Sequence, residues 1–212
     1  RELGLPRSTT YHLLRELEDS GFVVHLHKPS TYGLGLASYR MAQAYTTQQP
    51  LVRLAAKPLA RIAQVAGGSA HLTRLAGSEI VYLHEVRAPG AVSLVTQVGV
   101  RLPSLLTASG RIMLAQLPEA ELRAAYNSSG EHRHYSEIKQ ELSAYRRQGY
   151  ATEREAVSRG QESVAVAILD HLARPAAALA VTFPVDSVDT QRLVTALAEA
   201  ASGLREQFFG NV

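Results

Sequence analysis

Apolar residues recur at helical spacing near the start of the chain, at about 100° per residue. The apolar face consists of Thr10, Leu13, Leu14 and Leu17, and the polar face of Ser8, His12, Arg15 and Asp19. Pro6 precedes the pattern and Gly21 follows it, the usual residues for a helix's first turn and its end. We therefore predict a helix here with one core face and one polar face.

The following residues alternate as short strands do. Phe22 to Leu26, a turn at residues 28–31 and Tyr32 to Leu34 predict a small hairpin. Helical spacing returns from Leu36 to Ala66, where Pro50 and Pro58 are expected to break the helix or to stand in a first turn. The pattern indicates a small N-terminal unit followed by a linker helix.

Beyond Ser69 the period changes to that of strands. Strands are predicted over 70–75, 80–86, 92–98, 164–169 and 177–183, and helices over 110–117, 119–126, 135–148 and 188–209. Strands at both ends of this region with helices between them favour an α+β sheet domain.

Composition narrows the function. The 212 residues are 46% hydrophobic, without an apolar run long enough to span a membrane and without cysteine, so we expect a soluble, cytoplasmic protein with no disulfides. The net charge of +3 is too small to indicate a polyanion partner by itself. The chain begins with Arg1 rather than Met, and part of the natural N-terminus is expected to be absent.

Catalytic and metal chemistry are not favoured. His12, His25 and His27, or His132 and His134, lack a third ligand at usual spacing, so loop histidines are the better interpretation. Ser109 has no recognisable base and does not stand in a nucleophile elbow. We expect neither an enzyme nor a cofactor.

The first helix has the side chains that DNA reading needs. Small or hydrogen-bonding residues at its start let the backbone approach a major groove, and cations meet phosphates. The candidates are Arg7, Ser8, Thr9, Thr10, His12 and Arg15, with Lys28 in the hairpin as a wing residue. An ordinary surface helix followed by a β-turn fits the periodicity equally well.

Spaced motifs resolve this choice. In the first half they are Gly4–Thr9, Leu13-Leu14, Leu17, Gly21-Phe22 and Tyr32–Gly35; in the second, Val98–Pro103, Thr107–Arg111, Leu114-Ala115, Arg147–Ala151, Glu155, Gly160 and Ser163–Ala165. In this order they resemble the IclR family of bacterial transcriptional regulators, over essentially the whole chain.

The resemblance implies three parts: a winged helix-turn-helix over 1–35 without its first helices, a linker helix over 36–50, and a GAF-like effector-binding domain over 51–212. It implies a ligand-responsive regulator that acts as a homodimer or dimer of dimers on a double-stranded DNA operator. Repressors and activators resemble each other in this family, and of the two outputs we favour repression. A small organic acid would modulate it. The alternatives are a sensor acting through protein contacts and a small-molecule enzyme.

The resemblance also implies an effector pocket. Its residues would be Thr107, Ala108 and Ser109 at a helix N-terminus, with Glu153, Ser163, Ala180 and Thr182. Ala180 departs from the family's pattern, where a hydroxyl is expected, which favours a partly apolar or aromatic acid. The alternatives are helix capping for Thr107 and Ser109, and a solvated charge for Glu153.

Overall fold

The computed structural model describes residues 4, 6–27, 30–41, 50–94 and 96–210. The chain divides into two compact units, residues 1–49 and residues 50–212.

The first unit is a helix followed by a hairpin, as predicted. Helix α1 (Arg7–Asp19) is followed by strands β1 (Val23–His27) and β2 (Ser30–Leu34), which pair antiparallel. A further helical segment begins at Leu36 and is described to Met41. Gly21 takes a positive φ of 72°, and a Cβ at Gly35 would overlap the carbonyl oxygen of Gly21. The two glycines thus allow the end of the hairpin to return tightly to the end of α1.

The core face predicted for α1 is not buried. No residue of this helix is buried, and Leu13 and Leu17 are 47% and 42% exposed. The expectation was wrong for the described residues, because periodicity shows which face is apolar but not whether another element covers it.

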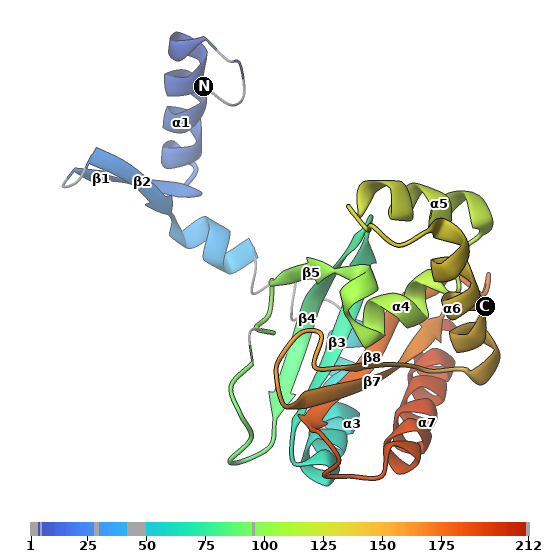
Figure 1. The fold of residues 1–212 in the computed structure, drawn as a ribbon. Coiled ribbons are helices and arrows are strands. Elements are labelled where there is room, and N and C mark those ends of the chain that lie inside the picture. The colour runs from blue at the N-terminus through green and yellow to red at the C-terminus, as the bar shows by residue number, and fades with distance from the viewer. Residues whose placement is uncertain (1–3, 5, 28–29, 42–49, 95, 211–212) are drawn as a thin grey trace. The chain divides into compact units, whose positions relative to one another are not determined.

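The second unit is built around one sheet (Figure 1). Its elements are α3 (Pro50–Ala66), β3 (Ser69–Ala76), β4 (Glu79–Arg87), β5 (Arg101–Pro103), η1 (Ser104–Leu106), α4 (Ala108–Leu114), α5 (Glu119–Ser128), α6 (Tyr135–Gln148), β6 (Ala151–Arg154), β7 (Gln161–Leu169), β8 (Pro175–Pro184) and α7 (Thr190–Phe209). The six strands pair antiparallel in the order β5-β4-β3-β8-β7-β6. The predicted α+β class is confirmed.

Helices cover both faces of this sheet (Figure 1). Helices α3 and α7 pack on one face, in a core that includes Leu59, Leu72 and Phe183. Helix α4 packs on the other face, where Ala165 and Ala178 let it come close to the strands. Helices α5 and α6 bury the outer side of α4 in a third cluster of side chains. Both faces are therefore dry, except where side chains leave a cavity.

Two predicted features differ from the structure. Pro58 lies inside α3 instead of breaking it; seven residues of that helix are buried, and their burial outweighs the roughly 3 kcal/mol cost of an interior proline. Residues 92–98 form no strand among those described, because they pair with no neighbouring strand. The segment contributes Leu94 and Thr96 to the protein interior as a loop.

The short edge strands β5 and β6 were not predicted. They have three and four residues, too few for an alternating pattern to be recognised. Strand β6 matters for function, because it carries Glu153.

Candidate functional site

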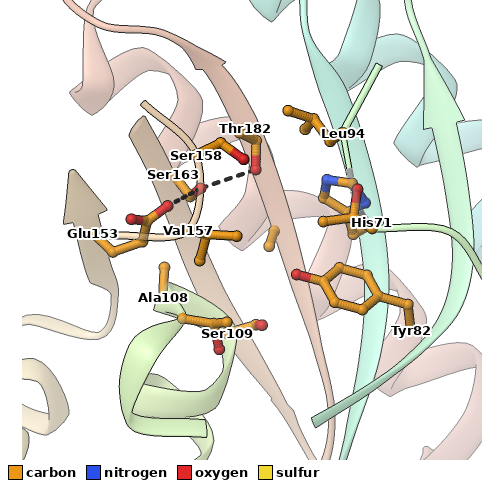
Figure 2. A pocket seen from close by; sticks show the side chains of 13 residues that line it. His71, Tyr82, Leu94, Ala108, Ser109, Glu153, Val157, Ser158, Ser163 and Thr182 are labelled. Carbon is orange, nitrogen blue, oxygen red and sulfur yellow. Dashed lines mark hydrogen bonds between the residues drawn. The ribbon is translucent and has the colours of Figure 1, made fainter. Parts of the chain in front are cut away.

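A cavity lies between the sheet and the start of α4. It is lined by His71, Tyr82, Leu94, Thr96, Thr107, Ala108, Ser109, Glu153, Val157, Ser158, Ser163, Ala180 and Thr182. These side chains come from the five strands β3, β4, β6, β7 and β8, from α4 with its N-cap, and from two loops (Figure 2). The structure thus brings together all seven of the residues predicted for effector binding.

Three neighbouring strands place the polar wall of this cavity. Glu153 on β6 stands opposite Ser163 on β7, and Ser163 stands opposite Thr182 on β8. The Ser163 hydroxyl donates to Glu153 Oε1 at 2.6 Å, and the oxygens of Ser163 and Thr182 are 2.9 Å apart (Figure 2). Ser163 has one proton and gives it to the carboxylate, so Thr182 is the donor to Ser163. Thr182 therefore donates to Ser163, and Ser163 donates to Glu153.

Glu153 is a buried carboxylate, only 4% exposed. Its second oxygen, Oε2, accepts from the backbone N–H of Ala156 at 3.0 Å. This position contradicts the alternative of a solvated charge. Each of its two oxygens thus accepts a hydrogen bond from within the fold, and no cation is paired with it among the described residues.

Helix α4 supplies the opposite end of the cavity. Thr107 is its N-cap, and its hydroxyl oxygen accepts from the N–H of Gly110 at 3.0 Å. The capping alternative thus describes a contact that Thr107 does make, while its side chain also lines the cavity. Ser109 is buried there as well. A Cβ at Gly110 would overlap the backbone of Ser104, so only glycine lets α4 approach η1 this closely.

Sequence reasoning missed two residues that bring titratable rings to the site, His71 on β3 and Tyr82 on β4. Neither ring nitrogen of His71 has a partner among the described residues, and burial, aided by the charge of Arg87, lowers its pKa to about 3. Burial, and then the charges of Glu153 and Glu85, raise the pKa of Tyr82. At neutral pH the site therefore holds an uncharged imidazole and an uncharged phenol, with ring centroids 5.2 Å apart.

A signal for His71 was present in the sequence. Ser69, His71 and Thr73 alternate with Ala70 and Leu72, so one face of β3 is polar. On a sheet with one open face such residues meet water. Here all three are buried, and their side chains have no partner among the described residues. A buried polar face without partners indicates a place where water or a ligand binds.

The cavity is small and carries one sign of charge. The volume open to the centre of a water molecule is about 20 Å³, room for roughly one or two waters. Glu153 is the only acidic side chain in the described lining, which contains no lysine or arginine, and His71 and Tyr82 are neutral. A larger ligand therefore requires the covering loops to move outward.

The residues predicted to meet DNA lie on α1. Arg7, Ser8 and Thr9 form its exposed first turn, and His12 and Arg15 are exposed further along. Thr10 is exposed too, but its hydroxyl donates to the carbonyl of Pro6 at 3.1 Å. Lys28 lies outside the described residues. Within the described ranges there is no cluster of three metal-ligating side chains, and no helix is long and apolar enough to cross a membrane.

Two family models match the chain. One describes the bacterial transcriptional regulator IclR C-terminal domain and matches residues 43–205; the other describes the IclR helix-turn-helix domain and matches residues 1–34. Together they span nearly all of the chain.

Named relatives agree with these models. The HTH-type transcriptional regulator XynR of Escherichia coli is 28% identical over 90% of this chain and 79% of its own length. The transcriptional repressor IclR of the same organism is 22% identical, over 91% of this chain and 74% of its own length. These relatives are transcriptional regulators rather than enzymes.

Solved structures share the fold. An IclR transcriptional regulator from Alicyclobacillus acidocaldarius superposes with a TM-score of 0.81 at 23% identity, covering 96% of this chain and 86% of that one. An IclR homologue from Microbacterium hydrocarbonoxydans, complexed with 4-hydroxybenzoate, gives 0.80 at 22% identity, covering 95% and 85%.

Proposed function

Because the chain belongs to the IclR family of bacterial transcriptional regulators, we propose that it is a ligand-responsive repressor whose operator binding is changed by a small organic acid. The cavity of the second unit would hold the acid, and α1 would read the operator. The observation that carries the proposal is the convergence of seven predicted residues, from three strands and one helix, on a single buried cavity.

The surface of α1 supports the DNA-binding part of the proposal. Among the described residues no side chain caps the N-terminus of α1, and its first turn holds no acidic residue, so Arg7 and the first backbone N–H groups are open to a phosphate. Ser8, Thr9 and His12 offer hydrogen bonds to base edges, and Arg15 a charge to the backbone. Lys28 would meet phosphate from the hairpin turn.

The closed state of the cavity supports ligand response. A pocket with room for one or two waters opens only if the segments carrying Leu94, Thr96, Val157 and Ser158 move outward. A ligand that binds only the open arrangement shifts the population toward it. In a homodimer, or a dimer of dimers, such a shift would change the spacing of two recognition helices and so the affinity for paired half-sites.

The test is a titration of the full-length protein against DNA from upstream of its own gene. An unrelated fragment serves as the control, and both are titrated at two salt concentrations. We expect preferential binding to the upstream fragment with a steep salt slope, and release of that fragment when an effective acid is added. Equal, weak binding to both fragments would favour the alternative of a sensor that acts through protein contacts.

A further inference from the structure

The cavity poses an electrostatic problem for an acid. A ligand carboxylate placed inside it would meet the Glu153 carboxylate in a water-poor space, where like charges repel most strongly. No lysine or arginine lines the cavity among the described residues.

The charged groups on the surrounding elements are engaged elsewhere. On α4, Arg111 donates to the carbonyls of Leu105 and Thr152 and lies 3.7 Å from Glu141. The other nearby ion pairs are Arg154 with Asp186 and Glu162, and Arg87 with Glu85. Arg159 and Glu155 are exposed, and neither lines the cavity. None of these side chains supplies the missing positive charge.

The remaining groups in the lining do not supply it either. His71 is neutral because it is buried, and Tyr82 keeps its proton. At the start of α4, the hydroxyl of Thr107 donates to the carbonyl of Ser104 at 3.4 Å and accepts from the N–H of Gly110 at 3.0 Å, and it carries no charge. On the far wall, Thr182 donates to Ser163 and Ser163 to Glu153, so that wall presents acceptor oxygens.

From this arrangement we propose that the cavity takes its ligand without net charge, so that an organic acid enters together with one proton shared between its carboxyl group and Glu153. The inference rests on the proposed function, because it requires the cavity to be the effector site. Two carboxyl groups brought together in one site share a proton because they cannot both ionise there. The proton comes from solvent, and the acceptor wall then receives a hydrogen bond from the protonated pair.

The consequence is a pH dependence with a defined sign. When binding takes up one proton, affinity falls as pH rises, by about tenfold per unit while the pair keeps its proton. An amide of the same shape has no carboxylate to neutralise. Its affinity is then independent of pH, and at pH 7.5 it exceeds that of the matching acid.

The experiment is calorimetry on the full-length protein with matched probes. The pairs are 4-hydroxybenzoate with 4-hydroxybenzamide, benzoate with benzamide, and lactate with lactamide. Each pair is titrated at pH 5.5, 6.5 and 7.5, and at each pH in two buffers of different ionisation enthalpy, which gives the number of protons taken up. We expect about one proton for every acid that binds and none for its amide.

Three variants locate the proton. E153Q should abolish the uptake and make acid binding independent of pH. The control is E162Q, which removes a charge of the same sign on the opposite face of the sheet, where Glu162 lies 3.4 Å from Arg154. This variant should keep the uptake. H71N should also keep it.

The outcomes separate the two proposals. Acid binding without proton uptake would overturn the inference and leave the cavity as an effector site. Uptake that persists in E153Q and disappears in H71N would overturn the assignment of the proton to Glu153. If no acid and no amide bound at any pH, the proposed effector role of the cavity would fail, and the inference with it.

Discussion

Helices α1 and α4 begin with similar residues and have opposite environments. Helix α1 has Ser8 and Thr9 in its first turn, no side-chain cap and no buried residue. Helix α4 follows the capping Thr107 and buries six of its seven residues. The exposed polar groups at the start of α1 can form hydrogen bonds with water or with a binding partner. The buried polar groups around α4 need hydrogen-bond partners within the fold. Substitutions in α1 should therefore change binding, and substitutions around α4 should change stability first.

The largest expected effect is at Gly110. In Gly110→Ala, the added Cβ would overlap backbone atoms of Ser104, which cannot move aside as a side chain could. We expect a loss of at least about 3 kcal/mol in the free energy of unfolding, measured by denaturant titration. Gly203→Ala in α7 is the control: nothing lies within 4 Å of its added Cβ, and it should stabilise the helix by about 0.5–1 kcal/mol. Equal effects of the two changes would contradict the close approach of α4 to η1.

The second effect is acid destabilisation of the second unit through His71. Burial lowers the pKa of His71 from its usual value of about 6.5 to about 3. Between these two pH values the unfolded chain binds a proton at this residue that the folded chain does not bind. Stability should fall as pH decreases from about 6.5 toward 3, with a slope of up to about 1.4 kcal/mol per pH unit.

The variant His71→Asn should lose this contribution to the slope, while His132→Asn, at an exposed site, should retain it. Unfolding curves between pH 7 and 4 measure both. A slope that is unchanged in His71→Asn would show that other groups cause the acid sensitivity.

Arg15→Ala tests the surface of α1. We expect several-fold weaker binding to every DNA sequence, and a salt slope of log K against log salt reduced by about 1, because one phosphate contact is lost. Stability should not change, since no residue of α1 is buried. Arg192→Ala, an exposed cation of α7, should leave the salt slope unaltered. An equal salt slope in the unmodified protein, Arg15→Ala and Arg192→Ala would contradict a phosphate contact by Arg15.

The smallest effects compare two hydroxyls at helix starts. Thr107→Val removes the hydrogen bond to the N–H of Gly110 and should lower the free energy of unfolding by about 1 kcal/mol. Ser8→Ala removes no cap and should leave stability unchanged, while altering which operator sequence is preferred. Thermal unfolding and competition between operator variants measure the two results. A stability loss in Ser8→Ala matching that in Thr107→Val would contradict the contrast between the helices.

Much of the fold could be predicted because long elements leave a clear period. The expected helix over 135–148 coincides with α6, and the strands over 164–169 and 177–183 lie inside β7 and β8. The prediction failed where one residue or a short segment depended on distant partners. Pro58 is accommodated by burial of the helix around it, and residues 92–98 have strand-like composition without a partner strand.

The seven candidate effector residues came from the resemblance, and the cavity has more lining residues than those. Thr96 was missed because residues 92–98 were expected to form a strand and form none among those described. His71 was missed because a polar residue in a strand usually marks a solvent-facing side. Whether that side meets water depends on elements far away in the chain. Here α4, α5 and α6 cover it, so the hydroxyls and the imidazole become interior groups without partners among the described residues.

By itself the sequence determined the element order, the division near residue 50 into two parts, the hydroxyl-rich start of α1 and the motifs of the family. These features depend on neighbouring residues or on spaced identities, which one chain displays directly. The tertiary structure alone decided that Glu153, Ser163 and Thr182 form one hydrogen-bonded row and that no cation in the described lining balances it. Strand register and burial set those two facts, because they bring together residues that are far apart in sequence and exclude water from the charges between them.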